Sequence, residues 1–333
     1  MNKKYIYILL LLSIAFTSQS KVGTTAAQFL GIGVGSKAMS MGGAFTSMVD
    51  DASSPYWNPG SIAHIKKNKF QITNASWLID TKWLYGSYVH RVDYRSTIAA
   101  NVFYLDYGDE EITTIYEQNG TGQYWTAYDL SAGLYYGVNL TNKFSFGGGI
   151  KYISQAIYNE SSSTVAFDMG LLYQNLSNNF RLGVSISNIG IDMNLEGTDL
   201  YFSCDPDPDN LGNNQNIPCA LSTGVYPLPI FYRLGISKDI TLFDNIILTG
   251  AIDWVIPNDD VEHINIGFEM GYFDKVFLRS GYRNIGKDDS EESLTFGLGS
   301  NFYIFGMDVD LNYTYHDFGV FGYVPYFEFV FNF

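Results

Sequence analysis

The last nine residues of this chain alternate between aromatic and other side chains. In a β-strand, residues 325–333 place Glu328 and Asn332 on one face and four phenylalanines on the other, namely Phe327, Phe329, Phe331 and Phe333. Leaving apolar area in water costs about 25 cal/mol per Å² relative to burial. Lipid covers such a face while the polar side chains look into a wet interior. We therefore expect this strand to belong to a membrane-spanning β-barrel and to act in its insertion.

The same period of two recurs along the chain. Between Thr126 and Val138, Tyr128, Leu130 and Leu134 share one face while Asp129, Ser131 and Gly133 share the other. Similar runs cover residues 144–152, 165–174, 180–187, 264–270, 294–299 and 307–315. The pattern predicts an all-β fold, a transmembrane antiparallel barrel of about 14 strands, each of roughly 9 to 12 residues.

The connections between these runs predict the orientation of the barrel. Outer-membrane barrels keep their periplasmic turns short and let their outer loops grow. Long connections at residues 106–124, 188–228, 257–261 and 284–291 alternate with tight polar turns at residues 92–95, 139–142 and 175–179. We expect the long ones to face outward.

The amino terminus predicts export. Lys3 and Lys4 precede the apolar run 5–16, which is followed by the small and polar residues 17–20, as in a secretory signal peptide. The run is shorter than the about 20 apolar residues that a membrane helix needs. We expect a signal peptide at residues 1–20, a plug segment at 21–66 and the barrel at 67–333, placed in the outer membrane of a Gram-negative-type cell after Sec-dependent export.

Composition narrows the class of protein further. The chain has 26 tyrosines and 24 phenylalanines, as expected where aromatic girdles lie at both membrane interfaces. Its net charge of −15 argues against nucleic acid as a partner, because the phosphates would be repelled.

The inward faces of the predicted strands carry charges of both signs, from which we expect a web of ion pairs. These residues are Asp129, Lys151, Asp168, Arg181, Arg233, Asp253, Glu269, Arg279, Arg283, Asp308, Asp310 and Glu328. The same faces carry many glycines, among them Gly147, Gly183 and Gly267. Glycine in a strand marks either the close approach of another backbone or a simple relief of crowding, and the sequence leaves both open.

A candidate filler for the lumen precedes the first strand. Residues 31–45 and 49–60 are rich in small side chains that pack inside a barrel without forcing its strands apart. We take the core of this plug motif to be Asp50, Asp51, Asn58, Pro59 and Gly60. The spaced glycines at 31, 33 and 35 do not predict a nucleotide site, because no strand leads into them.

The long segment 188–228 contains both cysteines, Cys204 and Cys219. In an exported protein we expect them to form a disulfide, with two free thiols as the alternative. Asp205, Asp207 and Asp209 have the alternating spacing of some calcium loops, but no glutamate follows at the EF-hand distance. A solvated acidic loop is therefore favoured over a calcium site, and we expect no cofactor.

The sequence shows little sign of a catalytic site. The four histidines have no zinc-like spacing, and the sequence contains no Gly-x-Ser-x-Gly elbow. We expect no catalytic residues and no enzyme activity. We assign His316 to an aromatic belt with Tyr313, Tyr315 and Tyr323.

Several segments together resemble the PorV/PorQ family of the type IX secretion system, within a wider group of FadL-like barrels. They are residues 40–45, 50–60, 105–114, 120–122, 151–153 and 226–229, with the phenylalanine-terminated last strand. Asn-Pro-Gly at residues 58–60 departs from the Asn-Pro-Ala more usual in FadL-like plugs, which weakens any transfer of their gating mechanism.

The resemblance implies a partner in secretion. Such a barrel would bind the C-terminal signal domain of cargo from a large translocon and pass the cargo to an attachment complex with a sortase-like protease. The other partners implied are outer-membrane lipid and the barrel-assembly machinery. The alternative is a FadL-like channel for hydrophobic small molecules. A PorV-like shuttle and a PorQ-like structural member share the quoted motifs, so that choice stays open.

Overall fold

The structure is a computed structural model that describes residues 22–207, 209–210, 214, 216–243, 245–288, 290–304 and 306–333. The predicted signal peptide at residues 1–20 lies outside the described residues.

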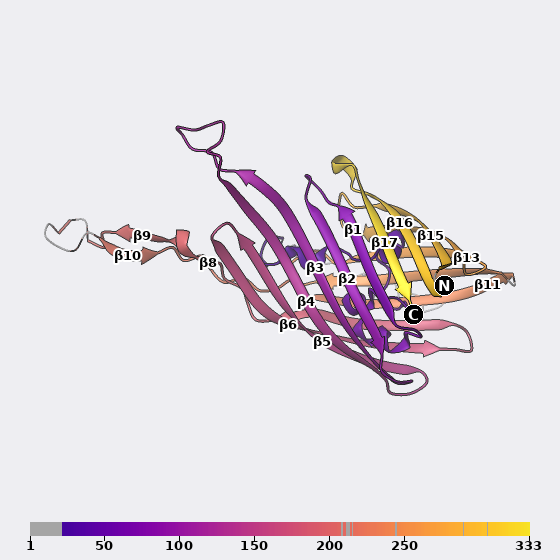
Figure 1. Cartoon of the computed structure of the whole chain (residues 1–333). Coiled ribbons are helices and arrows are strands. Elements are labelled where there is room, and N and C mark those ends of the chain that lie inside the picture. Colours follow the sequence, from indigo (N-terminus) through magenta and orange to yellow (C-terminus); the bar gives the residue numbers. More distant parts are fainter. Residues whose placement is uncertain are drawn as a thin grey trace, which may run out of the picture.

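A closed antiparallel barrel forms the body of the protein (Figure 1). Among the described residues it has fourteen strands, each paired with its neighbours, and β1–β17 and β7–β11 pairings join the two halves of the chain. The strands are β1 (Lys69–Ser76), β2 (Lys82–Arg91), β3 (Ser96–Glu111), β4 (Tyr124–Asn139), β5 (Phe144–Ile157), β6 (Glu160–Asn175), β7 (Phe180–Gly190), β11 (Phe231–Phe243), β12 (Ile246–Pro257), β13 (His263–Tyr272), β14 (Val276–Ile285), β15 (Leu294–Ile304), β16 (Met307–Asp317) and β17 (Tyr323–Asn332). The predicted fold class is confirmed.

The longer connections of the barrel lie at one end, which also has the short connection 158–159. This end, here called the loop end, carries residues 112–123, 191–230, 258–262 and 286–293. The other, the turn end, carries the short connections 92–95, 140–143 and 176–179. Several strands are longer than predicted, because their paired parts continue toward the loop end: Glu110 and Glu111 still pair with Trp125 and Tyr124.

Side chains alternate between lipid and lumen along each barrel strand. In β17 the side chain of Phe327 is 52% exposed, whereas that of Glu328 is 2% exposed. Phe329 and Phe333 are also exposed, Phe331 is half-buried, and Asn332 is buried. Since the outer surface of the barrel is apolar and its lumen is polar, the arrangement inverts that of a water-soluble domain.

The residues before β1 run through the barrel interior as irregular chain with four short helical turns (Figure 1). These are η1 (Gln28–Gly31), α2 (Ser36–Ser40), α3 (Ser54–Trp57) and η2 (Pro59–His64). Most of residues 26–65 are buried. No helix in the described part of the chain has the length and apolar character to span a membrane.

The longest connection is more ordered than the predicted loop. It contains β8 (Glu196–Gly197), η3 (Thr198–Leu200), β9 (Tyr201–Cys204) and β10 (Ile217–Ala220). A separate turn, η4 (Gly319–Phe321), lies between β16 and β17. Strands β9 and β10 form a separate two-stranded sheet that projects beyond the barrel (Figure 1).

Candidate functional site: the filled lumen and the loop end

Residues 22–68, here called the N-terminal segment, are held by polar side chains that point inward from the strands. Asp253 of β12 accepts the backbone N–H groups of Phe45 and Thr46, each at 2.8 Å. Glu328 accepts the N–H of Ser36 at 2.6 Å. These bonds satisfy backbone groups that would otherwise be buried without a partner.

Inward glycines let the backbone of the N-terminal segment touch the barrel wall. A Cβ atom on Gly147 would lie 2.0 Å from the carbonyl oxygen of Pro59, and one on Gly267 would lie 2.3 Å from that of Met41. Atoms of any other residue would therefore overlap the segment. Of the two explanations that the sequence left open for these glycines, the contacts favour close backbone approach.

Asn58 is the most connected residue of the predicted plug motif. Its Nδ2 donates to the carbonyl oxygens of Thr46 at 2.7 Å and Leu171 at 3.0 Å, and its Oδ1 accepts the N–H of Gly60. A Cβ on Gly60 would lie 2.8 Å from the carbonyl oxygen of Gly170. The glycine in Asn-Pro-Gly is thus matched to this barrel wall.

The acidic and proline residues of the motif have separate contacts. Asp51 accepts both the N–H and the hydroxyl of Ser53, while Asp50 lies 3.3 Å from the ammonium of Lys69 at the turn end. Pro59 begins η2, where its missing N–H is not needed.

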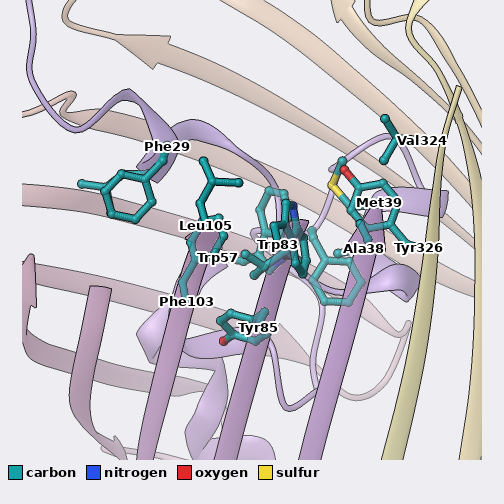
Figure 2. Close-up of a cluster of buried hydrophobic side chains, with 14 of the residues drawn as sticks. Phe29, Ala38, Met39, Trp57, Trp83, Tyr85, Phe103, Leu105, Val324 and Tyr326 are labelled. Carbon is teal, nitrogen blue, oxygen red and sulfur yellow. Dashed lines mark hydrogen bonds between the residues drawn. The ribbon is translucent and has the colours of Figure 1, made fainter. Parts of the chain in front are cut away.

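An apolar cluster joins the N-terminal segment to β2, β3 and β17 (Figure 2). Phe29 packs edge-on against Phe103 with ring centroids 5.4 Å apart, and Trp83 packs in the same way against Phe103 and Tyr326. The sequence predicted a polar, glycine-lined lumen and did not predict this apolar cluster. Trp83, Phe103 and Tyr326 lie at inward positions of the alternating pattern, so the sequence did contain the signal that these side chains face the lumen.

Most of the predicted inward charges form ion pairs. Lys151 pairs with Asp168 at 2.8 Å, and Arg279 pairs with Glu269 at 2.5 Å. Other partners were not among the predicted residues: Arg181 pairs with Asp239, and Arg283 with Glu292.

The remaining predicted charges have other contacts. Asp129 accepts from Tyr107 and Gln155, whereas the Arg233 guanidinium lies over the ring of Phe231 and donates to Ser187. At the turn end, Asp308 forms an ion pair with Lys67 of the N-terminal segment at 2.6 Å, and Asp310 accepts from Asn332.

The assignment of His316 to an aromatic belt is wrong. Its side chain is fully buried inside the barrel, with its ring 4.3 Å from that of Phe318. His316 shares its face of β16 with the inward residues Asn312 and Thr314, so strand alternation outweighs the aromatic neighbours Tyr313 and Tyr315.

Several groups of the N-terminal segment have shifted pKa values, among them His64 and Lys37. Burial lowers the pKa of His64 to about 4, with a smaller effect of the Arg181 charge. Its Nε2 lies 3.1 Å from the hydroxyl oxygen of Ser145. Burial also opposes the charge of Lys37, but the carboxylates of Glu269 and Asp51 outweigh it and raise the pKa of Lys37.

Cavities remain at both ends of the filled lumen. One of about 290 Å³ at the turn end is lined by Lys37, Asp51, Lys69, Arg279 and Asp310. One of about 430 Å³ at the loop end is lined by Tyr56, Trp57 and Phe231 together with Arg233, Arg283, Asp260 and Lys287. Both are strongly charged for sites that would hold a hydrophobic molecule.

The loop end is acidic and aromatic. Its carboxylates are on Asp80, Asp106, Asp109, Glu110, Glu111, Glu117, Asp192, Glu196, Asp199, Asp205, Asp207, Asp209, Asp259, Asp260, Glu262, Asp288, Glu291 and Glu292, and its exposed aromatic residues include Tyr116, Tyr124, Tyr201 and Phe202. In contrast, Lys66, Lys67, Arg91, Arg95, Lys143 and Lys275 lie at the turn end. The turn end also carries the carboxylates of Asp50, Asp93, Asp274, Asp308 and Asp310, so it has charges of both signs, whereas the loop end is predominantly acidic.

The two cysteines of the loop end are joined as a Cys204–Cys219 disulfide. Within the described ranges no cluster of three or more His, Cys, Asp or Glu side chains is arranged to hold a metal ion. Asp207 and Asp209 are exposed beside the disulfide.

The inverted polarity, the segregated connections and the barrel closed by fourteen described strands define an outer-membrane β-barrel. The family described as type IX secretion system protein PorV matches residues 15–200, and the chain belongs to this family. It is a component of the outer membrane with a role in type IX secretion. The family and fold are those of a secretion or transport barrel rather than of an enzyme class.

Solved structures share the fold. The toluene transporter TodX of Pseudomonas putida is 13% identical, with a TM-score of 0.53 over 90% of this chain and 96% of that chain. A Pseudomonas aeruginosa FadL homologue is 12% identical, with a TM-score of 0.50 over 95% of this chain and 98% of that chain. No curated protein matches the sequence.

Proposed function

We propose that the barrel binds the C-terminal signal domain of secreted cargo at its loop end and passes the cargo from the translocon to a surface attachment complex with a sortase-like protease. The observation that carries this proposal is a large acidic and aromatic surface, built by residues 106–124 and 191–230, above a lumen that the N-terminal segment fills. Membership of the PorV family supports the same role.

The filled lumen supports an adaptor rather than an open conduit. The N-terminal segment contributes side chains to the apolar cluster and also makes hydrogen bonds with the barrel wall, at Asp253 of β12 and Leu171 of β6. A folded cargo domain would therefore bind outside the lumen, on the connections. Aromatic residues give contact area at low entropic cost, and the acidic rim favours a basic partner surface.

A channel for hydrophobic small molecules is the second candidate. The 430 Å³ cavity favours it, because Tyr56, Trp57 and Phe231 give this cavity an aromatic side close to the loops. The charged residues of the same cavity and the filled lumen weigh against it.

One genetic experiment separates the two functions. Cells that lack the gene are compared with cells that carry the wild-type gene. Two quantities are measured in each: the amount of cargo on the cell surface and the uptake of a labelled fatty acid. We expect loss of surface cargo with unchanged uptake. Normal cargo secretion with lost uptake would instead support the channel.

Charge reversal tests the binding surface. Glu110→Lys with Glu111→Lys should reduce surface cargo, because both carboxylates lie at the exposed end of β3. Lys143→Glu at the turn end is the matched control and should leave surface cargo unchanged.

A further inference from the structure

The β9–β10 hairpin has two unequal edges. The backbone N–H of Leu221 donates to the carbonyl of Leu200 at 2.9 Å, and the pairing continues as Phe202 with Cys219 and Cys204 with Ile217. Hydrogen-bonded and non-hydrogen-bonded pairs alternate in an antiparallel ladder. Counting from Leu200, Tyr201 and Ser203 therefore direct their C=O groups away from β10, and Ser203 directs its N–H away too, whereas the N–H of Tyr201 donates to the carbonyl of Thr198 at the end of η3.

The opposite edge is blocked. By the same alternation, Pro218 and Ala220 direct their backbone groups away from β9. Proline has no N–H, so the β10 edge has lost a donor at its centre. Natural sheets protect free edges with proline or charge. Residues 201–204 contain neither, so β9 keeps an unprotected edge.

No described strand covers the β9 edge. Strand β9 pairs only with β10 in the described part of the chain, and Tyr201, Phe202 and Ser203 are all exposed. The aromatic rings of Tyr201 and Phe202 lie on opposite faces of the strand. An added strand would thus meet one ring on each side.

The hairpin is held in place before any partner arrives. The Cys204–Cys219 disulfide joins its two strands near the tip. At its base, β8 pairs with the start of β6, and Met193 and Tyr226 exchange backbone hydrogen bonds of 2.8 and 2.9 Å. Ordering an edge in advance lowers the entropy that a partner loses on binding.

From these observations we infer that the free edge of β9 is the cargo-docking strand, which a basic β-strand of the signal domain extends by backbone pairing. Backbone hydrogen bonds would give affinity, as in other cases of strand addition. Asp199 and Asp205 flank the edge, so lysine or arginine on the incoming strand matches its charge. The inference rests on the proposed function and specifies its contact.

Two proline variants test the edge directly. Ser203→Pro removes an outward N–H from β9, whereas Ala220→Pro removes one from the edge of β10 that Pro218 already blocks. Proline is tolerated at edge positions that face away from the ladder. With the full chain in detergent and the purified signal domain of one type IX substrate as probe, we expect Ser203→Pro to weaken binding about tenfold and Ala220→Pro to change it less than twofold.

Hydrogen exchange of the wild-type complex gives a readout independent of any variant. The amide of Ser203 should exchange rapidly in the free barrel and become protected in the complex. Binding without this protection would overturn the docking strand and leave the proposed function standing. A wild-type barrel that binds no signal domain would overturn both.

Discussion

Gly147 shows how one inward residue determines what the lumen can contain. A methyl group on Gly147 would overlap the carbonyl oxygen of Pro59, whereas one on Gly148 would lie 3.5 Å from its nearest neighbour, the carbonyl oxygen of Asp168. We predict that Gly147→Ala destabilises the packing of the N-terminal segment by about 1–3 kcal/mol, as overpacking does elsewhere. Tryptic cleavage at Lys37 should then become faster.

Gly148→Ala is the matched control for this prediction. Its added methyl group faces outward from the same stretch of β5, so cleavage at Lys37 should stay at the wild-type rate. Equal cleavage of both variants would show that contact with Pro59 does not hold the segment.

His64 makes the folding stability depend on pH. Its pKa is about 4 in the folded protein and about 6.5 when unfolded, so the unfolded chain binds more protons between these values. The contribution of His64 to the free energy of unfolding is complete above pH 6.5 and is lost as the pH falls toward 4. The loss has an upper limit of about 3 kcal/mol. Urea unfolding in detergent at pH 7.5 and pH 4.5 measures this loss.

The control for the pH prediction is His64→Gln, which keeps a polar group near Ser145 but does not titrate. The variant should lose less stability than the wild type between the two pH values. An identical loss in both proteins would assign the pH dependence to other groups.

At the scale of elements, the β9–β10 hairpin and the barrel are expected to respond independently. We predict that Cys204→Ser with Cys219→Ser makes residues 191–230 more sensitive to protease, because a cross-link with a sequence separation of 15 contributes about 3 kcal/mol. The barrel should keep its melting temperature, since neither hairpin strand pairs with a barrel strand. A fall in that temperature would show that the hairpin supports the barrel.

The elements that could be predicted from the sequence are those with a long alternating pattern. In β4 and β17 the pattern also separates lipid-facing from lumen-facing side chains, because one face must meet hydrocarbon. Strands β9 and β10 have four residues each and lie in an acidic connection, so their pattern is too short to distinguish from a loop.

Contacts between distant strands set a different limit. Asp253 was predicted to face inward, but its acceptance of the N–H groups of Phe45 and Thr46 depends on where the N-terminal segment lies. Arg181 and its partner Asp239 instead lie on the paired strands β7 and β11, which are separated in the sequence by the longest connection. Alternation gives the face of a residue, whereas the partner across the lumen depends on how the barrel closes.

At the scale of the whole molecule, the N-terminal segment decides whether the barrel conducts. We propose that it acts as a plug, because it contacts inward groups on strands from both halves of the barrel, including Ser145 of β5 and Asp253 of β12. Deleting residues 22–66 should open a polar, charge-lined lumen and give a large single-channel conductance in planar bilayers, where the wild type should conduct little. The shift in gel mobility on heating, compared between the two proteins, verifies that the shortened chain still forms a barrel. A folded deletion variant with the wild-type conductance would contradict the plug.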